Sequence, residues 1–246
     1  MPLGQGTRQN KMAEPEVVRL NKFLAERLGI SRRQADDLIA NGEVMVRKAD
    51  STEKKPAVLG ARIDKSDEVW YNNSMVPFEV GYSYIAMNKP VGYVCSRKRQ
   101  GAAPTIFELL PEELRDLKTV GRLDKDSSGL ILLTNDGDFA FQMTHPKFVK
   151  EKVYEVELDR ELEPLHQQMI SDFGIDLPDG KSQLGLEKMD DTRKAWKVYM
   201  SEGRNRQIRR TFEAVGYKVV KLHRVQFGKY QLAGLKPGEY TTVQRV

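Results

Sequence analysis

The sequence predicts an α+β protein built from a small domain and a larger one. Its 246 residues suit one large domain or a small plus a medium one, and a composition of 39% hydrophobic and 30% charged residues can bury a real core while keeping a charged surface. The expected strands are short, bounded by turn residues and antiparallel in character. A few helices lie between them, which favours the α+β class. We expect a disordered arm at 1–16, a small domain at 17–76, a linker at 77–82 and a larger domain with a mainly antiparallel sheet at 83–246.

The small domain opens with two predicted helices. Apolar residues recur with helical spacing between 19 and 28, and the glycine that follows is a natural helix end. Ser31 followed by Gln34 predicts a capping box at the start of the second helix. Short strands are expected at 44–46 and 68–71, so that two helices pack beside a small antiparallel sheet.

The larger domain is expected to mix strands with helices. Its clearest strand is 152–158, where apolar and polar residues alternate. Further strands are predicted at 83–87, 130–133, 194–200 and 217–222. Helices are predicted at 105–117, 138–144, 163–173 and 208–215, with Pro111 in the middle of the first.

A polar loop stands directly before the buried strand 130–133. It holds two carboxylates, and a rigid strand with a charged loop at its end is a common support for a reactive group. Extended backbone would place Arg122 and Asp124 on one side of the loop and Leu123 on the other. The alternative is a solvated turn in which an aspartate caps a backbone amide.

Clusters of lysine and arginine are more informative than the small net charge of +5. They lie at 32–33, 97–99 and 204–210. Such clusters suit a nucleic-acid backbone, although each one alone also fits an ordinary solvated surface. The last cluster is expected at the start of a helix, where the helix dipole disfavours cations, so anionic partners are expected there.

Several classes of protein are disfavoured by what the sequence lacks. The single cysteine, Cys95, rules out an intramolecular disulfide, and the three histidines are too dispersed for a metal cluster. No strand is followed by the glycine fingerprint of a nucleotide cofactor, so neither metal nor cofactor is expected. No apolar run approaches the roughly 18 residues of a membrane helix, and residues 1–10 lack the apolar stretch of a signal peptide. We therefore expect a cytoplasmic protein without a membrane partner.

The small domain resembles a known RNA-binding module. Its segments Arg-Leu-Asn-Lys-Phe-Leu-Ala, Gly-Ile-Ser-Arg-Arg-Gln-Ala-Asp and Gly-Glu-Val-Met-Val are similar to the S-four type, first described in a ribosomal protein. The resemblance implies that Lys22, Arg32 and Arg33 line an RNA-binding face. The helix pair by itself is also compatible with a DNA-binding helix-turn-helix.

The larger domain resembles the RNA pseudouridine synthases. Residues 121–137, Gly-Arg-Leu-Asp-Lys-Asp-Ser-Ser-Gly-Leu-Ile-Leu-Leu-Thr-Asn-Asp-Gly, are similar to the catalytic motif of that family, above all of the RsuA/RluB/RluF group that acts on ribosomal RNA. Asn-Lys-Pro at 88–90 resembles the family's lysine–proline motif, and Glu-Gly-Arg-Asn-Arg-Gln-Ile-Arg-Arg at 202–210 resembles its third motif. The resemblance extends over about 18–243.

This resemblance implies roles for single residues. It makes Asp124 the catalytic aspartate, pairs Arg209 with it, and packs Tyr154 against the target uracil. The expected contacts with the substrate come from Lys89, Arg122, Arg206 and Leu222. The expected contacts with RNA phosphates come from Arg97, Lys98, Arg204 and Arg210.

Asp126 is the rival carboxylate, because it lies close to Asp124 in the same loop. Its position does not match the family's catalytic aspartate, so an Asp126→Asn enzyme is expected to keep much of its activity. Whether Asp124 acts as a nucleophile or as a base toward the sugar stays open at this point.

The expected function is the isomerisation of one uridine in ribosomal RNA to pseudouridine, after the base has been flipped out of the stack. The partner is then ribosomal RNA or a pre-ribosomal particle, and a monomer is the default. Sequence cues for the two ribosomal subunits conflict, so neither subunit is assigned. One alternative is a non-catalytic ribosome-assembly factor. A methyltransferase would need a glycine-rich loop for its cofactor, and the sequence shows none.

Overall fold

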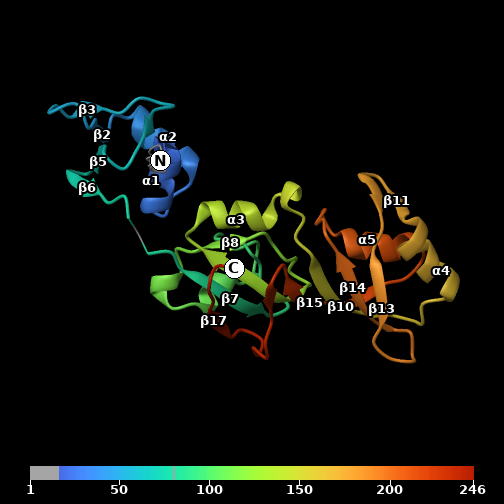
Figure 1. Cartoon of the computed structure of the whole chain (residues 1–246). Helices are drawn as coiled ribbons and strands as arrows, with labels where there is room; N and C mark the ends of the chain where they lie inside the picture. The colour runs from blue at the N-terminus through green and yellow to red at the C-terminus, as the bar shows by residue number, and fades with distance from the viewer. Residues whose placement is uncertain (1–16, 80) are drawn as a thin grey trace, which may run out of the picture. The chain divides into compact units, whose positions relative to one another are not determined.

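A computed structural model describes residues 17–79 and 81–246 of the chain (Figure 1). The arm predicted at 1–16 lies outside the described residues. The chain divides into two compact units, with the boundary between Gly81 and Tyr82. Each unit has a hydrophobic core of its own.

The N-terminal unit combines two helices with short antiparallel strands. Its elements are β1 (Val18–Arg19), α1 (Leu20–Arg27), α2 (Arg32–Ala40), β2 (Val44–Arg47), β3 (Lys55–Pro56), β4 (Arg62–Ile63), β5 (Glu68–Tyr71) and β6 (Ser74–Val76). A sheet in the order β3-β2-β5-β6 packs with both helices, and β1 pairs with β4. The predicted capping box of α2 is confirmed, because the Gln34 amide donates to Ser31 Oγ at 3.2 Å and the Ser31 amide donates to Gln34 Oε1 at 2.9 Å.

The larger unit is built on one nine-stranded sheet. Its strands are β7 (Tyr84–Lys89), β8 (Lys118–Val120), β9 (Ser128–Thr134), β10 (Lys152–Leu158), β13 (Gly185–Lys188), β14 (Ala195–Met200), β15 (Val219–Phe227), β16 (Tyr230–Gln231) and β17 (Tyr240–Thr242). The path through the sheet is β13-β14-β10-β15-β9-β7-β17, with β8 on β9 and β16 on β15. Only the β15–β9 pair among these described strands is parallel, which confirms the predicted α+β class.

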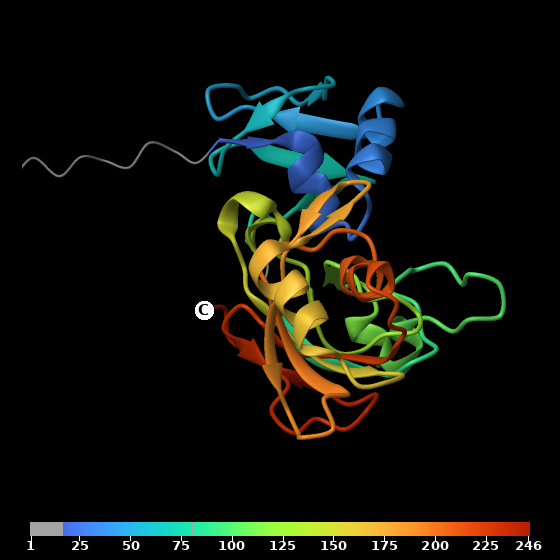
Figure 2. The same ribbon diagram turned by 90° about the vertical axis from the view of Figure 1, so that its right-hand side faces the viewer.

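Helices and a hairpin complete this unit. They are α3 (Gly137–Thr144), α4 (Pro164–Gln168) with a π-helical turn at Met169–Phe173, α5 (Gln207–Ala214), and the hairpin of β11 (Ile175–Leu177) and β12 (Gly180–Ser182). Helices α4 and α5 lie at the part of the sheet formed by β10, β13 and β14 (Figures 1 and 2). A 3-10 turn at Pro146–Phe148 follows α3.

The buried strand predicted at 130–133 is confirmed as the centre of β9. Ile131 and Leu133 belong to the core that contains α5, whereas Leu130 and Leu132 belong to the core that contains α3. Both faces of β9 are therefore covered, which explains why its apolar residues form a continuous run instead of alternating with polar ones. The polar loop before β9 is therefore attached to a strand that is packed on both faces.

The helix predicted at 105–117 is wrong. The structure has two 3-10 turns, at Ile106–Leu109 and Glu112–Leu114. Pro111 separates them with an extended ψ of 159°, and Leu110 before it is also extended, at ψ 147°. A proline cannot continue the helical hydrogen bonds, and it pushes the preceding residue out of the helical region.

Gly129 allows β9 and β15 to lie unusually close. It pairs with Arg224 in the parallel register and has a φ of +104°, which side chains rarely adopt. A Cβ on Gly129 would lie 2.2 Å from the Arg224 carbonyl oxygen. The strand contact next to the polar loop therefore requires glycine.

We predict that Gly129→Ala lowers the free energy of unfolding by about 3 kcal/mol or more, because both the clash with the Arg224 backbone and the strained φ are costly. Urea unfolding measures this loss. Gly238→Ala is the matched control, since Gly238 has a φ of +88° but nothing lies within 4 Å of the position that its Cβ would take. It should lose only about 1 kcal/mol. Equal losses in the two variants would contradict a role for the close approach.

Candidate active site

A cavity of about 520 Å³ opens beside the polar loop before β9. Three segments line it: the loop at 121–124, the end of α3 with its following turn at 143–146, and the loop into α5 at 200–208. Side chains from β10 and β15 complete it, among them Tyr154 and Leu222. A cavity of this size suits a small ligand or a single extruded base.

Arg206 is the cation that reaches both carboxylates of the loop. Its Nη1 lies 3.4 Å from Asp124 Oδ2 and donates to Asp126 Oδ1 at 3.0 Å, and its Nη2 donates to Asp126 Oδ2 at 3.0 Å. Its hydrogen bond to Asp126, together with the nearby charge of Arg209, holds the pKa of the Asp126 carboxyl below its usual value.

The expected pairing of Arg209 with Asp124 differs from what the structure shows. Arg209 Nε lies 3.3 Å from Asp126 Oδ2, so its ion pair is with the rival carboxylate. Its other nitrogens donate to backbone oxygens, at 2.7 Å to Val219 and 2.9 Å to Asp126. These bonds fix Arg209 between the loop and β15, and they leave Arg206 to contact Asp124.

Arg206 adopts a backbone conformation that is uncommon for a side-chain-bearing residue. It caps the N-terminus of α5 with φ 46° and ψ 31°, in the left-handed region. Such conformations cost energy and are concentrated at functional sites. Arg206 adopts this conformation while its guanidinium contacts both Asp124 and Asp126.

Lys89 is not where a substrate could touch it. Its side chain is wholly buried, and its ammonium donates to the carbonyl oxygens of Pro90 at 3.1 Å, Asp124 at 2.9 Å and Ser127 at 2.6 Å. Burial lowers the pKa of this ammonium. The expected contact of Lys89 with substrate is therefore corrected: Lys89 holds the loop at 124–127 through hydrogen bonds to its backbone.

Tyr154 and Leu222 both reach the cavity from central strands of the sheet. Each is 7% exposed, and β10 and β15 pair next to them with a bulge between Val153 and Tyr154. A bulge can redirect a side chain toward a site. Arg122 is exposed and also lines the cavity. The structure thus brings these three residues to the cavity that holds Asp124.

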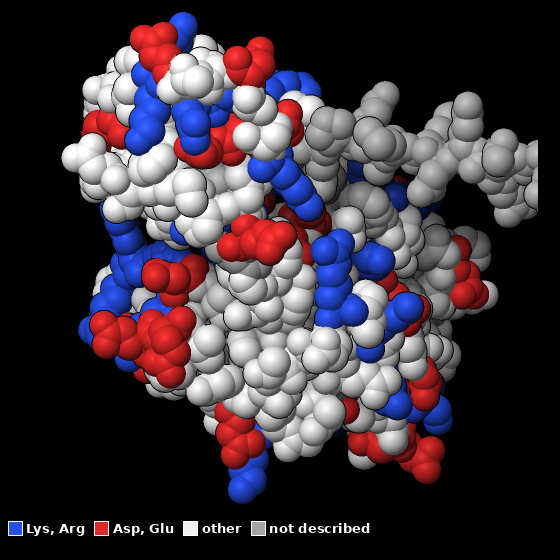
Figure 3. All heavy atoms as spheres, turned by 60° about the vertical axis from the view of Figure 1, so that its left-hand side comes forward, with Lys and Arg blue, Asp and Glu red and all other residues white. Residues whose placement is uncertain are grey.

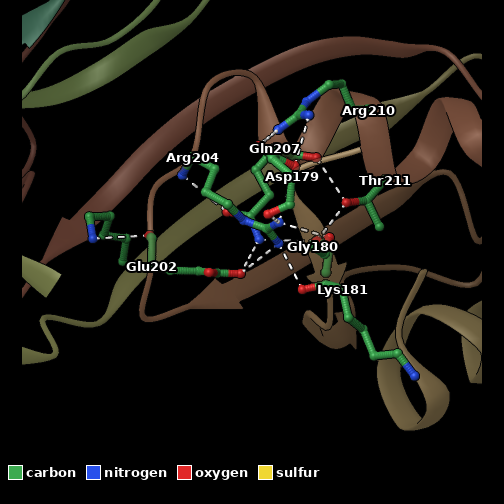
Figure 4. Close-up of polar contacts among 10 residues, drawn as sticks. Asp179, Gly180, Lys181, Glu202, Arg204, Gln207, Arg210 and Thr211 are labelled. Atoms are coloured by element: carbon green, nitrogen blue, oxygen red, sulfur yellow. Dashed lines mark hydrogen bonds and ion pairs between the residues drawn. The ribbon is translucent and has the colours of Figure 1, made fainter. Parts of the chain in front are cut away.

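Arg204 and Arg210 have partners within the chain (Figure 4). Arg204 Nη1 lies 3.1 Å from Asp179 Oδ1 and donates to Gly180 O at 2.8 Å, and its Nη2 donates to Lys181 O at 2.8 Å. Arg210 donates to both oxygens of Asp179, at 3.0 and 2.7 Å. These two arginines, which were expected to contact RNA phosphates, thus fasten the β11–β12 hairpin to α5.

Buried polar side chains reinforce the same junction. Gln207 is 2% exposed and donates from Nε2 to Ser182 Oγ at 3.0 Å, and Thr211 Oγ1 donates to the same oxygen at 2.8 Å. Gln207 Oε1 accepts from the Arg204 amide at 3.2 Å. Because buried polar groups must be hydrogen-bonded, this network fixes the loop that carries Arg206.

Five further residues were predicted to contact RNA. Arg97 donates to Leu117 O at 3.1 Å and lies 5.1 Å from the Phe107 ring centroid, so it is tied to the chain, whereas Lys98 is exposed. In the N-terminal unit, Arg32 donates to Asn21 Oδ1 at 3.1 Å and Arg33 is exposed; Lys22 belongs to α1. On the face that Figure 3 shows, basic and acidic side chains are interspersed.

Lys152 is a cavity residue that the sequence analysis missed. Its ammonium donates to the carbonyl oxygens of Lys150 at 3.2 Å and Glu202 at 3.1 Å. Burial and the positive charge of Arg224 lower its pKa to about 8. The sequence did contain a signal for Lys152. It begins a strongly alternating strand and lies two residues before Tyr154.

Neither a metal cluster nor a membrane helix is present in the described parts of the chain. No group of three or more metal-binding side chains occurs between residues 17 and 246, leaving aside residue 80. Across the same residues, no helix has the length and apolarity to cross a bilayer.

Comparisons with known proteins agree on one family. Residues 83–214 match the family model of RNA pseudouridylate synthases. Ribosomal small subunit pseudouridine synthase A of Pasteurella multocida is 36% identical over 231 residues, which cover 92% of this chain and 96% of that protein. Ribosomal large subunit pseudouridine synthase B of Bacillus subtilis is 34% identical over 227 residues, 90% of each. A crystal structure of a pseudouridylate synthase aligns with a TM-score of 0.64 and 34% identity, covering 92% of this chain and 96% of that one.

We predict that Lys89→Met lowers the free energy of unfolding by about 2 kcal/mol, because three carbonyl oxygens lose their charged donor while the desolvation cost of the ammonium disappears. Hydrogen exchange at the Ser127 amide, which donates to Asp124 O, should accelerate. Lys125→Met, at an exposed lysine of the same loop, should change neither quantity. Unaltered exchange in Lys89→Met would refute the supporting role.

Lys152 should make stability depend on pH. Its folded pKa of about 8 lies below the unfolded value of about 10.4, so the unfolded chain binds more protons between these values. The free energy of unfolding of the wild type should therefore rise with pH from about 8 to 10, relative to a Lys152→Met variant. Urea unfolding of both proteins across this range measures the difference. A constant or falling difference would contradict the lowered pKa.

Proposed function

Because the chain belongs to the RNA pseudouridylate synthase family, we propose that it converts a specific uridine of ribosomal RNA to pseudouridine, with Asp124 as the catalytic group. The two relatives described above are pseudouridine synthases named for the small and the large ribosomal subunit, which supports this class of substrate. Its partner is ribosomal RNA or a pre-ribosomal particle, and its place of work is the cytoplasm.

The proposed reaction moves one bond without net oxidation or reduction. The bond between uracil N1 and the sugar C1′ breaks, and a bond from uracil C5 to the same carbon forms. The hydrogen on C5 leaves as a proton, and N1, which loses its bond to the sugar, takes up a proton. Such a step asks the protein for an ionised carboxylate at the sugar, a surface that holds the freed uracil, and a cavity that excludes water.

The observation that carries the proposal is the place of Asp124 in the cavity. Its carboxylate lies 3.4 Å from Arg206, on a loop whose backbone Lys89 holds. Both chemical roles of Asp124, as nucleophile at C1′ or as base toward the sugar, require that it be held in a fixed position.

The neighbouring side chains fit the handling of a flipped uridine. Tyr154 offers a ring to stack on uracil, and Leu222 offers an apolar contact beneath it. Arg122, at the exposed edge, is placed to hold the flipped nucleotide or to fill the position that it leaves. Unstacking a base costs a few kcal/mol, which these contacts offset.

The N-terminal unit is proposed to bind the RNA through basic side chains of its two helices. Its S-four-type sequence places Lys22 on α1 and Arg32 and Arg33 at the start of α2. Backbone amides and the helix dipole at that start favour a phosphate group. This binding needs no chemistry, and it would persist if Asp124 were replaced.

We predict that Asp124→Asn abolishes tritium release from ribosomal RNA labelled at C5 of uridine. The loss should exceed about 100-fold, since the amide can serve neither as nucleophile nor as base. Asp126→Asn is the matched control from the same loop and should keep much of its activity, although it weakens the hold on Arg206. RNA binding should be retained in both variants.

Three outcomes would contradict parts of this proposal. No release by wild type from either subunit's RNA, free or partly assembled, would favour the non-catalytic assembly factor. Full activity of Asp124→Asn would show that the loop has been misinterpreted. An equal loss in Asp126→Asn would overturn the choice between the two carboxylates.

A further inference from the structure

An exposed cluster of aromatic rings lies at the end of α3 and in the turn that follows. The ring centroids of Phe141 and His145 are 4.6 Å apart, and those of Phe141 and Phe148 are 5.8 Å apart in an edge-to-face arrangement. Phe141 is 46% exposed, His145 is exposed and Phe148 is half-buried. We call these three residues the aromatic rim. Large rings that remain this exposed contribute little to a core, and they commonly mark a binding surface.

The aromatic rim is continuous with the cavity that holds Asp124. His145 belongs to both, because it lines the cavity together with Thr144 and Pro146 and contacts Phe141 on its other side. A second, shallower hollow also includes Pro146, together with the exposed Val149. A ligand that extends from the cavity past His145 therefore reaches the rim directly.

The charge around the rim suits a nucleic acid. From residue 139 to residue 150, a segment flanked by Asp138 and Glu151, the charged side chains are Lys147 and Lys150. Lys147 Nζ lies 5.3 Å from the Phe141 ring centroid and 4.7 Å from that of Phe148. Lys150 lines the cavity. Aromatic faces with ammonium groups beside them match the alternation of bases and phosphates in a single strand.

The turn that carries the rim is locally fixed in an uncommon conformation. Val149 has φ 42° and is 67% exposed, although a β-branched residue is disfavoured in the left-handed region. Pro146 starts the turn, and the Lys147 amide donates to His145 Nδ1 at 3.2 Å. The Thr144 hydroxyl donates to Ala140 O at 2.7 Å, just before His145. These features hold His145 and Phe148 in position before any ligand arrives.

We propose that the aromatic rim is a stacking platform for an unpaired nucleobase next to the target uridine. The inference rests on the proposed function. When a uridine leaves the stack, its neighbour loses a partner, and exposed aromatic side chains can replace that partner without reading its sequence. The rim lies where the strand would leave the cavity, and Lys147 and Lys150 are placed for the adjoining phosphates.

The test uses the full chain and two short single-stranded oligouridylates. Each carries one fluorescent base, 2-aminopurine, which stands directly before the central uridine in one oligonucleotide and directly after it in the other. Wild type should quench the fluorescence of one of the two probes on binding, as stacking does. Phe141→Leu, which keeps an apolar side chain on α3 but removes the ring, should lose the quenching and bind about 10-fold more weakly. Phe148→Leu is a second variant with the same expected direction.

Phe173→Leu is the matched control, because Phe173 is 63% exposed but belongs to the helical turn at Met169–Phe173 and not to the aromatic rim. Its binding and quenching should equal those of wild type. If Phe141→Leu and Phe148→Leu bound the oligonucleotide and quenched its fluorescence as strongly as wild type does, the platform would be overturned. The same would follow if their weaker binding persisted on an oligonucleotide with an abasic residue in place of 2-aminopurine. Tritium release by wild type tests the proposed function separately, since it can succeed while the platform fails.

Discussion

The geometry of the cavity depends on the buried hydrogen bonds that fix the loop before β9. The ammonium of Lys89 is excluded from water and bonds the backbone oxygens of Asp124 and Ser127. A charged donor in such a site makes stronger hydrogen bonds than a neutral or solvated one. On the far side of the loop, Gly129 allows the β15 backbone to approach β9. The loop is therefore fixed at Asp124 and at the end that joins β9, and the carboxylate that it presents has little freedom to move.

The arginines of the stretch 204–210 divide into two pairs with different tasks. Arg206 and Arg209 turn toward the loop of Asp124 and Asp126. The other two grip Asp179 and fasten the β11–β12 hairpin to α5. Cations at a helix start oppose the helix dipole, so each of the four requires an anion. The fold provides carboxylates for all of them, and in this way it keeps the strained Arg206 close to Asp124.

Local patterns predicted those features that depend on neighbouring residues. The capping box at Ser31 and the buried strand at 130–133 follow from residue order alone, and both are present. The partner of Arg209 could not be predicted in this way, because two carboxylates lie within one loop and only the packing of α5 against β15 decides between them. The burial of Lys89 was equally hidden, since its three acceptors are backbone oxygens, which every sequence contains. The mistaken helix at 105–117 came from giving apolar spacing more weight than Pro111.

The internal pairing of arginines changes where the binding energy for RNA can come from. Arg97, Arg204 and Arg210 direct their donors to the chain itself, so the larger unit offers phosphates fewer cations than its composition suggests. When phosphate contacts contribute little of the binding free energy, binding relies less on the release of counterions and more on the stacking of bases. Tyr154 inside the cavity and the aromatic rim at its edge are surfaces that could supply it. In the proposed complex, the faces of the bases would then hold the uridine and its neighbour in place. Attraction of the RNA backbone would fall to Lys147 and Lys150 beside the rim and to the start of α2 in the N-terminal unit.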